Sequence, residues 1–339
     1  MEIQVEDIKQ KIYCEIEFYK QFVNSFPKSV YPNDQSITKT KCWIELYSYF
    51  SKNKMFFDIS EKELIELSEQ NEYFKFLIKQ WGENKIETYK LNFPDLEKFE
   101  DCISINQDSL ESVYLSCKSD ELCKKVEDSF GIKVISIDKI FDESNFFNVH
   151  IETVEKGDKS HTNWDFLHIF SHPCNSLAIV DNYILKDTNV IDENLIPVLD
   201  KVLPSNLKIP FHLSVFAKND FHNKERYELI KETLDKLRPN LSFRISVFQL
   251  RSEFHDRTLI TNYLILDSGS GFDLFSNKKA KHQTKITGYY PFSASNINFN
   301  ARFSYQVLRK SMKEVYDKGV SNEKFQDVWG EKENRLFEN

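Results

Sequence analysis

The sequence predicts an α/β protein: a mixed sheet with flanking helices, preceded by a mostly helical region that includes a small α/β element. Through the first 85 residues, apolar side chains recur at the spacing of amphipathic helices. Beyond residue 145, short apolar runs of strand length alternate with helical stretches, which is typical of a sheet covered by helices on both faces. The 339 residues suffice for two domains at the usual size of roughly 100 to 200 residues each.

Composition limits the classes of protein to which the chain can belong. No apolar run approaches the roughly 20 residues that a membrane span needs, and the first residues lack the basic and apolar regions of a signal peptide. The six cysteines are scattered without the paired spacing of a zinc site or a disulfide framework. We therefore expect a cytoplasmic protein with no metal and no cofactor.

The net charge of -8 opposes broad, non-specific attraction to nucleic acid or to an anionic membrane. Any binding of such a ligand must therefore depend on a local group of basic residues. The abundance of Lys, Asn, Ile and Phe is typical of proteins encoded by AT-rich genomes, which favours a bacterial source.

In the N-terminal region, helical spacing runs over residues 5–26 and ends at Pro27. A second helical stretch contains Trp43, and a third begins after Ser60, whose hydroxyl can cap a helix while Glu63 reaches back to its backbone. The aromatic residues of these stretches recur at helical spacing, so we expect a hydrophobic core rather than a surface for stacking bases.

The pattern then changes to that of a small α/β element. Short apolar runs predict strands over 102–105, 112–115 and 132–137. Between the last two, the spacing predicts a helix over 120–130 that ends at Gly131.

The change of pattern near residue 145 predicts the domain boundary, giving an N-terminal domain over 1–144, a second domain over 145–320 and a polar tail over 321–339. The second domain is predicted to contain helices over 164–170, 194–203, 224–237 and 304–316 and strands over 177–180, 209–216 and 243–250.

The stretch over 254–272 follows the last of these strands. Leu and Ile positions over 258–266 predict a half-buried strand that runs into a glycine-rich turn. His255 and Arg257 then point the same way at the entrance of this strand. A solvated strand start followed by a hairpin is the plain structural alternative.

The spacing of this stretch resembles that of phospholipase D-type phosphodiesterases, which carry His-x-Lys-x4-Asp-x6-Gly-Ser-x-Asn. The same offsets hold, in order, His255, Arg257, Asn262, Gly269, Ser270 and Phe272. In such enzymes the histidine attacks phosphorus and forms a phosphohistidine, while the lysine, serine and asparagine hold the phosphate oxygens. The resemblance therefore implies a phosphodiesterase or metal-independent nuclease with His255, Arg257, Asn262 and Ser270 as catalytic residues.

A second resemblance, over roughly residues 160 to 295, is to the phospholipase D-like C-terminal domain of the eukaryotic MIT-domain cytokinesis proteins. It rests on His255-Asp256-Arg257 with Asn262, on the glycine-rich segment 269–275, and on the upstream strand 176–184. In that family the domain dimerises and binds acidic lipid headgroups without recognised catalysis. The alternative function is therefore a non-catalytic dimerisation scaffold that binds phosphate or protein.

One motif copy per chain implies a homodimer, because this chemistry needs two histidines across a twofold axis. The other His-x-Lys in the chain, at His222 and Lys224, is followed by Leu229 where the motif needs an acidic residue. By resemblance, such domains in AT-rich bacteria often act in anti-phage or other conflict systems, where a partner protein is expected.

A concentrated basic run follows the glycine-rich turn, and it includes Lys278, Lys279 and Lys281. Two interpretations remain open: a solvated loop, or a surface that holds the phosphates of nucleic acid together with Arg257 and the turn at Gly269 and Ser270.

Overall fold

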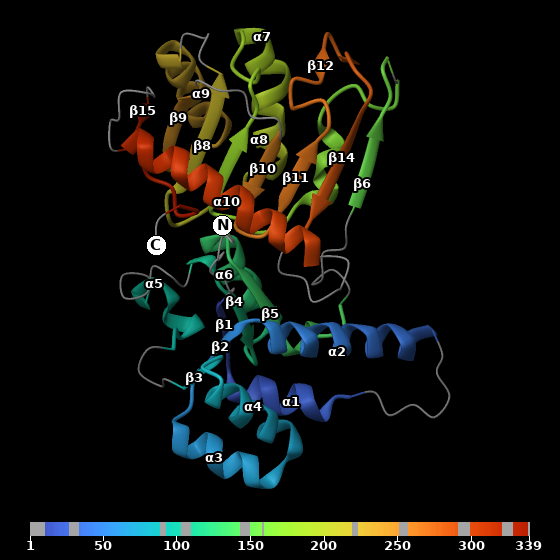
Figure 1. The fold of residues 1–339 in the computed structure, drawn as a ribbon, viewed down its shortest axis with the longest axis vertical. Helices are drawn as coiled ribbons and strands as arrows, with labels where there is room; N and C mark the ends of the chain where they lie inside the picture. The colour runs from blue at the N-terminus through green and yellow to red at the C-terminus, as the bar shows by residue number, and fades with distance from the viewer. Residues whose placement is uncertain are drawn as a thin grey trace, which may run out of the picture. The chain divides into compact units, whose positions relative to one another are not determined.

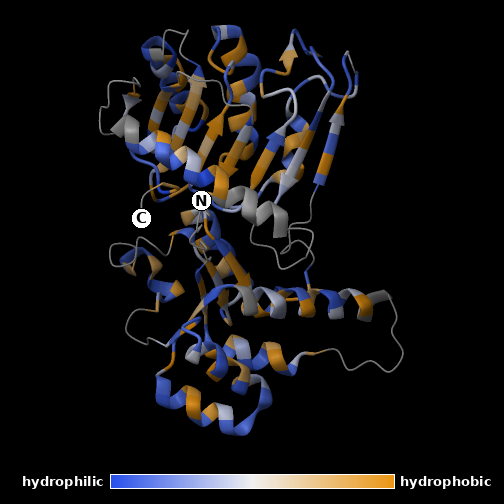
Figure 2. Cartoon of the chain, in the orientation of Figure 1, coloured by the Kyte–Doolittle hydropathy of each residue, from blue (hydrophilic) through white to orange (hydrophobic). Residues whose placement is uncertain are grey.

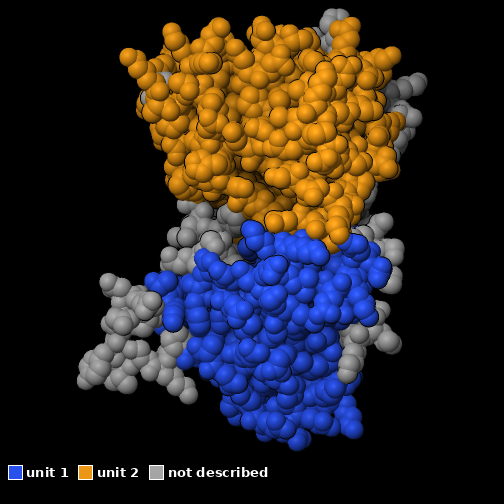
Figure 3. Space-filling model, turned by 180° about the vertical axis from the view of Figure 1, so that it is seen from behind, with its two compact units in different colours: residues 1–127, 131–147, 292–299 blue, residues 128–130, 148–291, 300–339 orange. Residues whose placement is uncertain are grey.

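The computed structural model describes residues 11–26, 34–88, 93–102, 110–142, 150–157, 159–218, 223–250, 257–290, 299–320 and 328–337. The chain forms two compact units (Figure 3): the first is Met1–Glu127 with Gly131–Phe147 and Phe292–Phe299, and the second is the remainder. Both contain sheets flanked by helices, so the predicted α/β class is confirmed. Within the described ranges, no helix has both the length and the hydrophobicity of a membrane span.

The first unit contains a five-stranded sheet in the order β3-β2-β1-β4-β5, in which every neighbouring pair is parallel. Its strands are β1 (Lys11–Cys14), β2 (Lys54–Phe57), β3 (Ile86–Thr88), β4 (Val113–Ser116) and β5 (Lys133–Ser136). Its helices are α1 (Ile16–Asn24), α2 (Asp34–Lys52), α3 (Glu61–Gln70), α4 (Glu72–Gly82), α5 (Phe99–Cys102) and α6 (Asp120–Phe130).

The helix predicted over 5–26 is shorter than expected. Residues 1–10 lie outside the described ranges, Lys11–Cys14 forms β1, and α1 begins at Ile16. Since β1 is the central strand of a parallel sheet, its apolar residues lie on both faces and show no alternation. The strands predicted after residue 100 therefore belong to a sheet that extends through the whole region.

Smaller predictions for this unit have separate outcomes. Ser60 and Glu63 form a capping box at the start of α3, and Gly131 ends α6 in the left-handed region with φ 62°, as predicted. The strand predicted over 102–105 falls mostly outside the described residues, and Cys102 is the last residue of helix α5.

The second unit contains an eight-stranded mixed sheet in the order β15-β9-β8-β7-β10-β11-β14-β6. Its strands are β6 (His150–Val154), β7 (Ser176–Val180), β8 (Phe211–Lys218), β9 (Phe243–Leu250), β10 (Thr258–Thr261), β11 (Ile265–Ser268), β14 (Thr284–Tyr289) and β15 (Val328–Gly330). Strands β7, β8 and β9 are parallel, and β10 runs antiparallel to β7. A separate small hairpin pairs β12 (Phe275–Ser276) with β13 (Lys279–Ala280).

Helices cover both faces of this sheet. In Figure 1, α10 (Phe299–Val320) crosses one face, and α8 (Ile196–Val202) and α9 (Asn223–Leu237) lie on the other. The short α7 (Thr188–Val190) leads towards α8 through one π-helical turn. The central strands between these layers are buried and strongly apolar (Figure 2), which is expected of a sheet covered on both faces.

The single strand predicted over 258–266 is two strands. Residues Asn262 to Leu264 form a turn between β10 and β11, which pair antiparallel. The Thr261 hydroxyl closes this turn by accepting hydrogen bonds from the backbone N–H groups of Tyr263 (3.3 Å) and Leu264 (3.1 Å). The apolar run continues through both strands because both lie in the core, so periodicity did not reveal the turn.

The polar tail predicted over 321–339 is partly incorporated into the second unit. Strand β15 pairs antiparallel with β9, and Leu336 and Phe337 are buried. The Asn334 side-chain amide is buried as well and donates to the Leu177 carbonyl (3.1 Å) and the Ser214 hydroxyl (2.9 Å). Hydrogen bonds thus allow this polar sequence to lie in the interior.

Candidate functional site

The strand register places Arg257 between the ends of two other strands. In the antiparallel pairing, Thr258 of β10 lies opposite Val180 of β7 and opposite Asp267 of β11. Arg257 therefore lies next to Asp181, directly after β7, and its carbonyl accepts a hydrogen bond from Ser268 N (3.0 Å). The parallel strands β7 and β8 end at this edge, and open α/β sheets bind ligands outside the carboxyl ends of their strands. We refer to Asp181, Tyr183, Arg257 and Gly271 as the open edge.

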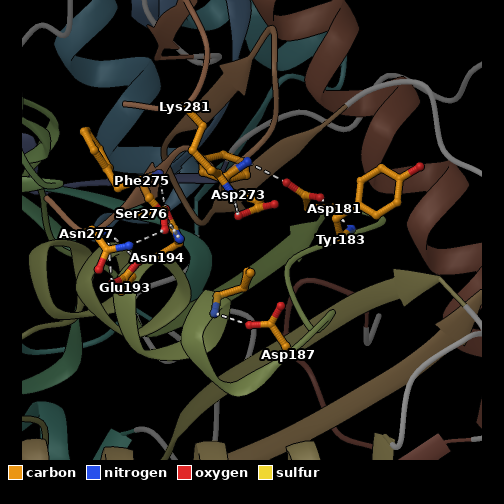
Figure 4. A network of polar contacts seen from close by, with 12 residues as sticks. Asp181, Tyr183, Asp187, Glu193, Asn194, Asp273, Phe275, Ser276, Asn277 and Lys281 are labelled. Carbon is orange, nitrogen blue, oxygen red and sulfur yellow. Dashed lines mark hydrogen bonds and ion pairs between the residues drawn. The ribbon is translucent and has the colours of Figure 1, made fainter. Parts of the chain in front are cut away.

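Asp181 connects two loops of the open edge. Its carboxylate is 1% exposed and accepts hydrogen bonds from the backbone N–H groups of Tyr183 (2.8 Å) and Phe272 (2.5 Å). Burial raises the pKa of Asp181, although these two hydrogen bonds and the charge of Arg257 act to lower it. Figure 4 shows Asp181 and Tyr183 beside each other on the segment that follows β7.

Gly271 allows the arginine to lie close to the turn. Its φ is +90°, and a Cβ atom there would lie 2.6 Å from the Asp181 carboxylate and 2.8 Å from Cδ of Arg257. The Ser268 hydroxyl donates to the Gly271 carbonyl (2.6 Å) and fixes the turn. A side chain at this position would strain the backbone and displace the charged groups on either side.

Arg257 is half-buried, and its guanidinium forms no hydrogen bond with the residues that the structure describes. Nε is buried and has no hydrogen-bond partner among the described residues. Within the same ranges no carboxylate forms an ion pair with the guanidinium, although its charge is near enough to lower the pKa of Asp181. Its Cζ atom lies 6.0 Å from the centroid of the Tyr183 ring. A guanidinium with unused donors can bind phosphate oxygens through two parallel hydrogen bonds.

The predicted nucleophile, His255, lies outside the described residues, as does Asp256. The catalytic role of His255 therefore remains a prediction, which rests on the motif spacing that places it two positions before Arg257.

Asn262 was predicted to lie at the site with Arg257, and the structure places it at the opposite end of β10. The turn after β10 begins at Asn262, so five residue steps of about 3.3 Å separate it from Arg257. Its side-chain oxygen accepts from the backbone N–H groups of Asn175 (2.9 Å) and Ser176 (3.1 Å), and its amide donates to the Asn175 side chain (3.1 Å). Asn262 thus stabilises the start of β7.

A second group of residues surrounds this opposite end of the sheet. The Arg335 guanidinium donates to the backbone carbonyls of Asn175 (3.3 Å) and Pro210 (2.8 Å), and its backbone N–H donates to Nδ1 of His212 (3.2 Å). We refer to Asn175, His212, Asn262 and Arg335 as the closed edge.

Gly269 and Ser270 lie in the turn beside Gly271, and their polar groups connect the turn to the segment that enters β14. The Ser270 hydroxyl donates to the Gln283 carbonyl (3.0 Å), and its N–H donates to the Thr284 hydroxyl (2.9 Å). Gly269 N donates to the Lys285 carbonyl (3.1 Å). The prediction that Ser270 holds phosphate therefore requires its hydroxyl to leave the Gln283 carbonyl.

Phe272 fills the offset where the motif has asparagine, and it is a core residue. Its ring is fully buried and lies 5.9 Å from the Trp164 ring, centroid to centroid. Its contribution to the open edge is the backbone N–H that Asp181 accepts.

The basic run forms the β12–β13 hairpin and the segment that follows it. Lys278 and Lys279 are exposed and form no ion pair within the described ranges, whereas Lys281 pairs with Asp273. Asn277 and Lys278 form the tight turn, with φ of 51° and 60°. Two of the three lysines predicted to bind phosphate thus have no carboxylate partner among the described residues.

The base of this hairpin is held by Asn194, as Figure 4 shows. The Asn194 side-chain oxygen accepts from Phe275 N (2.7 Å) and from the Trp164 indole (3.2 Å), and its amide donates to the Phe275 carbonyl (2.9 Å). At the tip, Asn277 N donates to the Glu193 carboxylate (3.1 and 3.2 Å). These contacts fix the hairpin that carries the exposed lysines.

Asp181, Tyr183 and Gly271 were not among the site residues predicted from the sequence. The relevant signal was a pair of polar residues directly after the buried apolar strand β7. That pattern is typical of the carboxyl end of a parallel strand, where ligand-binding residues occur.

Comparisons with known proteins do not assign the chain to a family. No family model matches it, and no curated protein does. Among solved structures, one match is to TrmBL2, described as an archaeal chromatin protein with a novel mode of DNA binding, at 13% identity and a TM-score of 0.21. The match covers 57% of this chain and 60% of that one, and a TM-score this low does not indicate a common fold.

Proposed function

We propose that the second unit is a phospholipase D-like domain that binds a phosphodiester, with nucleic acid as the ligand, at Arg257. The observation that carries the proposal is the arginine itself. Its guanidinium packs on a glycine backbone at the carboxyl ends of parallel strands, with a buried Nε that no described residue accepts. A buried donor without a partner costs about 1 to 3 kcal/mol, and a bound phosphate oxygen would remove that cost.

Local charge supports a polyanionic ligand. Lys278 and Lys279 add two exposed cations on the hairpin that follows the glycine turn. Because the whole chain carries a net charge of -8, attraction to nucleic acid depends on such a local group rather than on the protein as a whole.

In the catalytic form of this proposal, the domain is a metal-independent nuclease. His255 attacks phosphorus, the bond to the leaving oxygen breaks, and a second histidine protonates that oxygen. Water then hydrolyses the phosphohistidine and releases the phosphate. Because the chain has one motif copy, the second histidine would come from another chain in a homodimer.

A second candidate function is a binding scaffold without turnover. It is favoured by the structural contacts that the other described motif residues make within the fold. Asn262 stabilises the start of β7, the Ser270 hydroxyl is bonded to a carbonyl, and Phe272 lies in the core. Among the described motif side chains, only Arg257 keeps functional groups that the fold does not use. Phosphate binding alone requires no more than this.

The test measures binding and hydrolysis with the full-length protein. Affinity for labelled single-stranded DNA and RNA is measured by fluorescence anisotropy, and hydrolysis of the same strands is followed in the presence of a chelator. Arg257→Ala is expected to weaken binding about ten-fold or more, since it removes charge-assisted hydrogen bonds to phosphate. The matched control is Arg244→Ala in β9. Arg244 already pairs with Glu331 at 2.8 Å, so its substitution should leave binding unchanged.

The same experiment separates the two functions. Hydrolysis by the wild type that disappears in His255→Ala supports the nuclease. Binding that depends on Arg257, without hydrolysis by any form, supports the scaffold. Equal affinities of wild type and Arg257→Ala would overturn the proposal in both forms.

A further inference from the structure

Tyr183 is an exposed aromatic residue in a fixed position beside Arg257. Its side chain is 37% exposed, and its hydroxyl has no hydrogen-bond partner among the described residues. Figure 4 shows the Tyr183 ring beside Asp181, whose carboxylate accepts from the backbone N–H of Tyr183. Cζ of Arg257 lies 6.0 Å from the centroid of the Tyr183 ring.

The backbone around Tyr183 is held on both sides. Tyr183 N donates to Asp181 (2.8 Å), and the Tyr183 carbonyl accepts from Lys186 N (3.0 Å). The next two side chains, Ile184 and Leu185, are fully buried. The chain therefore presents an aromatic ring on a rigid support, so a ligand that stacks on it costs little conformational entropy.

A comparison with Tyr73 of α4 distinguishes this arrangement from ordinary surface exposure. Tyr73 is also 37% exposed, but its ring contacts those of Trp43 (6.2 Å) and Tyr47 (6.5 Å). Tyr73 thus belongs to an aromatic cluster of the first unit. Tyr183 has instead a cation with unused donors as its neighbour.

We infer that the open edge binds single-stranded nucleic acid, with one base stacked on Tyr183 and an adjacent phosphate held by Arg257. This inference rests on the proposed function and adds the substrate class. An aromatic ring beside a cation is the arrangement that binds unpaired bases, because every base has a flat face and lies next to a phosphate. In a duplex the faces of the bases are covered by their neighbours, and a lipid headgroup has no aromatic face.

The experiment compares ligands that differ only in the feature under test. Fluorescence anisotropy measures binding to a labelled single strand, to its duplex and to an abasic strand of the same length. Co-sedimentation measures binding to vesicles of phosphatidylcholine and phosphatidylserine. The variants are Tyr183→Ala, Tyr183→Phe and the control Tyr73→Ala. Circular dichroism checks that each variant is folded.

Tyr183→Ala is expected to weaken binding of the base-bearing single strand about 5-fold to 100-fold, the usual effect of losing one stacked base. The abasic strand should bind the wild type and Tyr183→Ala within about two-fold of each other. Tyr183→Phe keeps the ring and should retain the wild-type affinity, and Tyr73→Ala should behave as the wild type.

Two results would overturn the inference while the proposed function stands: base-bearing and abasic strands that bind equally through Arg257, or a duplex that binds at least as tightly as the single strand. Preferential binding to the vesicles would overturn the inference and also the choice of nucleic acid in the proposed function, because a lipid headgroup would then be the ligand. If Arg257→Ala binds every ligand as the wild type does, the proposed function itself fails.

Discussion

The two edges of the eight-stranded sheet each contain an arginine, and they use it differently. At the closed edge, the Arg335 guanidinium donates to the backbone carbonyls of Asn175 and Pro210. At the open edge, the Arg257 guanidinium lies against Gly271, and its buried Nε has no acceptor among the described residues. Buried polar groups in folded proteins are nearly always bonded. Among the described residues the exceptions also include Nε of Arg226 and of Arg238, but Arg257 lies beside the carboxyl ends of the parallel strands β7 and β8.

The difference shows that an arginine can stabilise the fold in one place and keep hydrogen-bond donors for a ligand in another. Arg335 fixes the amino ends of β7 and β8, where Asn262 and His212 also have bonded side chains. Beyond the carboxyl ends of those strands, the Asp181 side chain bonds two backbone N–H groups, and no described carboxylate forms an ion pair with the nearby Arg257 guanidinium. Stability and binding should therefore respond to substitution at opposite edges.

The largest expected effect is the pH dependence of stability at the closed edge. Burial, together with the charges of Arg335 and Arg244, lowers the pKa of His212 from 6.5 to about 3. The folded protein therefore holds this imidazole neutral, while the unfolded chain takes up a proton below pH 6.5. The stabilisation is fully present above pH 6.5 and is lost as the pH falls towards about 3, by about 3 to 5 kcal/mol in total.

The measurement is denaturant unfolding of the second unit between pH 7 and pH 4. His212→Asn keeps an acceptor for the Arg335 N–H and removes the titration, so the wild type should lose more stability than this variant as the pH falls. His168→Asn provides the control, because His168 is an exposed histidine of the same unit. Parallel pH profiles for wild type and His212→Asn would contradict the neutral, buried imidazole.

The next effect separates the two edges directly. Asn262→Ala leaves the backbone N–H groups of Asn175 and Ser176 without their acceptor, so the free energy of unfolding should fall by about 3 kcal/mol. The affinity of the folded variant for a single-stranded oligonucleotide should not change. Arg257→Ala should give the reverse result: binding weakens and stability is not lost, because the substitution removes a buried donor that has no acceptor among the described residues.

Asn163→Ala is the matched control for Asn262→Ala. Asn163 is exposed, and its side chain makes two hydrogen bonds, both to Asp165. Its loss should cost less than about 1 kcal/mol, since water replaces the bonds. If Asn262→Ala weakened oligonucleotide binding at unchanged stability, Asn262 would belong to the binding site, as the spacing alone predicted.

These cases show which parts of the fold and site the sequence could predict. Helices with caps, such as α3 and α6, follow from local chemistry, and the long strands β8 and β9 from apolar runs between turns. The spacing also identified Arg257 correctly as a residue at the start of a strand. It did not show that the chain turns at Asn262, because both strands of the hairpin are buried and their apolar run is continuous.

The other differences between prediction and structure have the same physical origin: the spacing of apolar residues does not show which segments are buried by contacts with distant parts of the chain. Strand β1 has four residues in the middle of a parallel sheet, so it shows no alternation and merges with the pattern of helix α1. The segment around Asn334 has a polar sequence, yet it is buried because its amide bonds Leu177 and Ser214. The Asp181 side chain accepts a hydrogen bond from Phe272, 91 positions away in the sequence, and no local pattern encodes that contact.

The smallest effect is expected for Ser270→Ala. This substitution tests whether a motif residue other than Arg257 binds phosphate at the open edge. The Ser270 hydroxyl donates to the Gln283 carbonyl in a half-exposed turn, so Ser270→Ala should change the free energy of unfolding by less than about 1 kcal/mol. If phosphate is bound by Arg257 without help from this hydroxyl, affinity for the single strand should change by less than about two-fold. Ser276→Ala in strand β12 is the control for loss of a serine hydroxyl from the neighbouring hairpin. A loss of affinity of about ten-fold or more in Ser270→Ala alone would mean that the hydroxyl leaves the carbonyl and turns to the ligand. The open edge would then contain a second phosphate-binding group, and the resemblance to the phosphodiesterase motif would extend beyond the arginine.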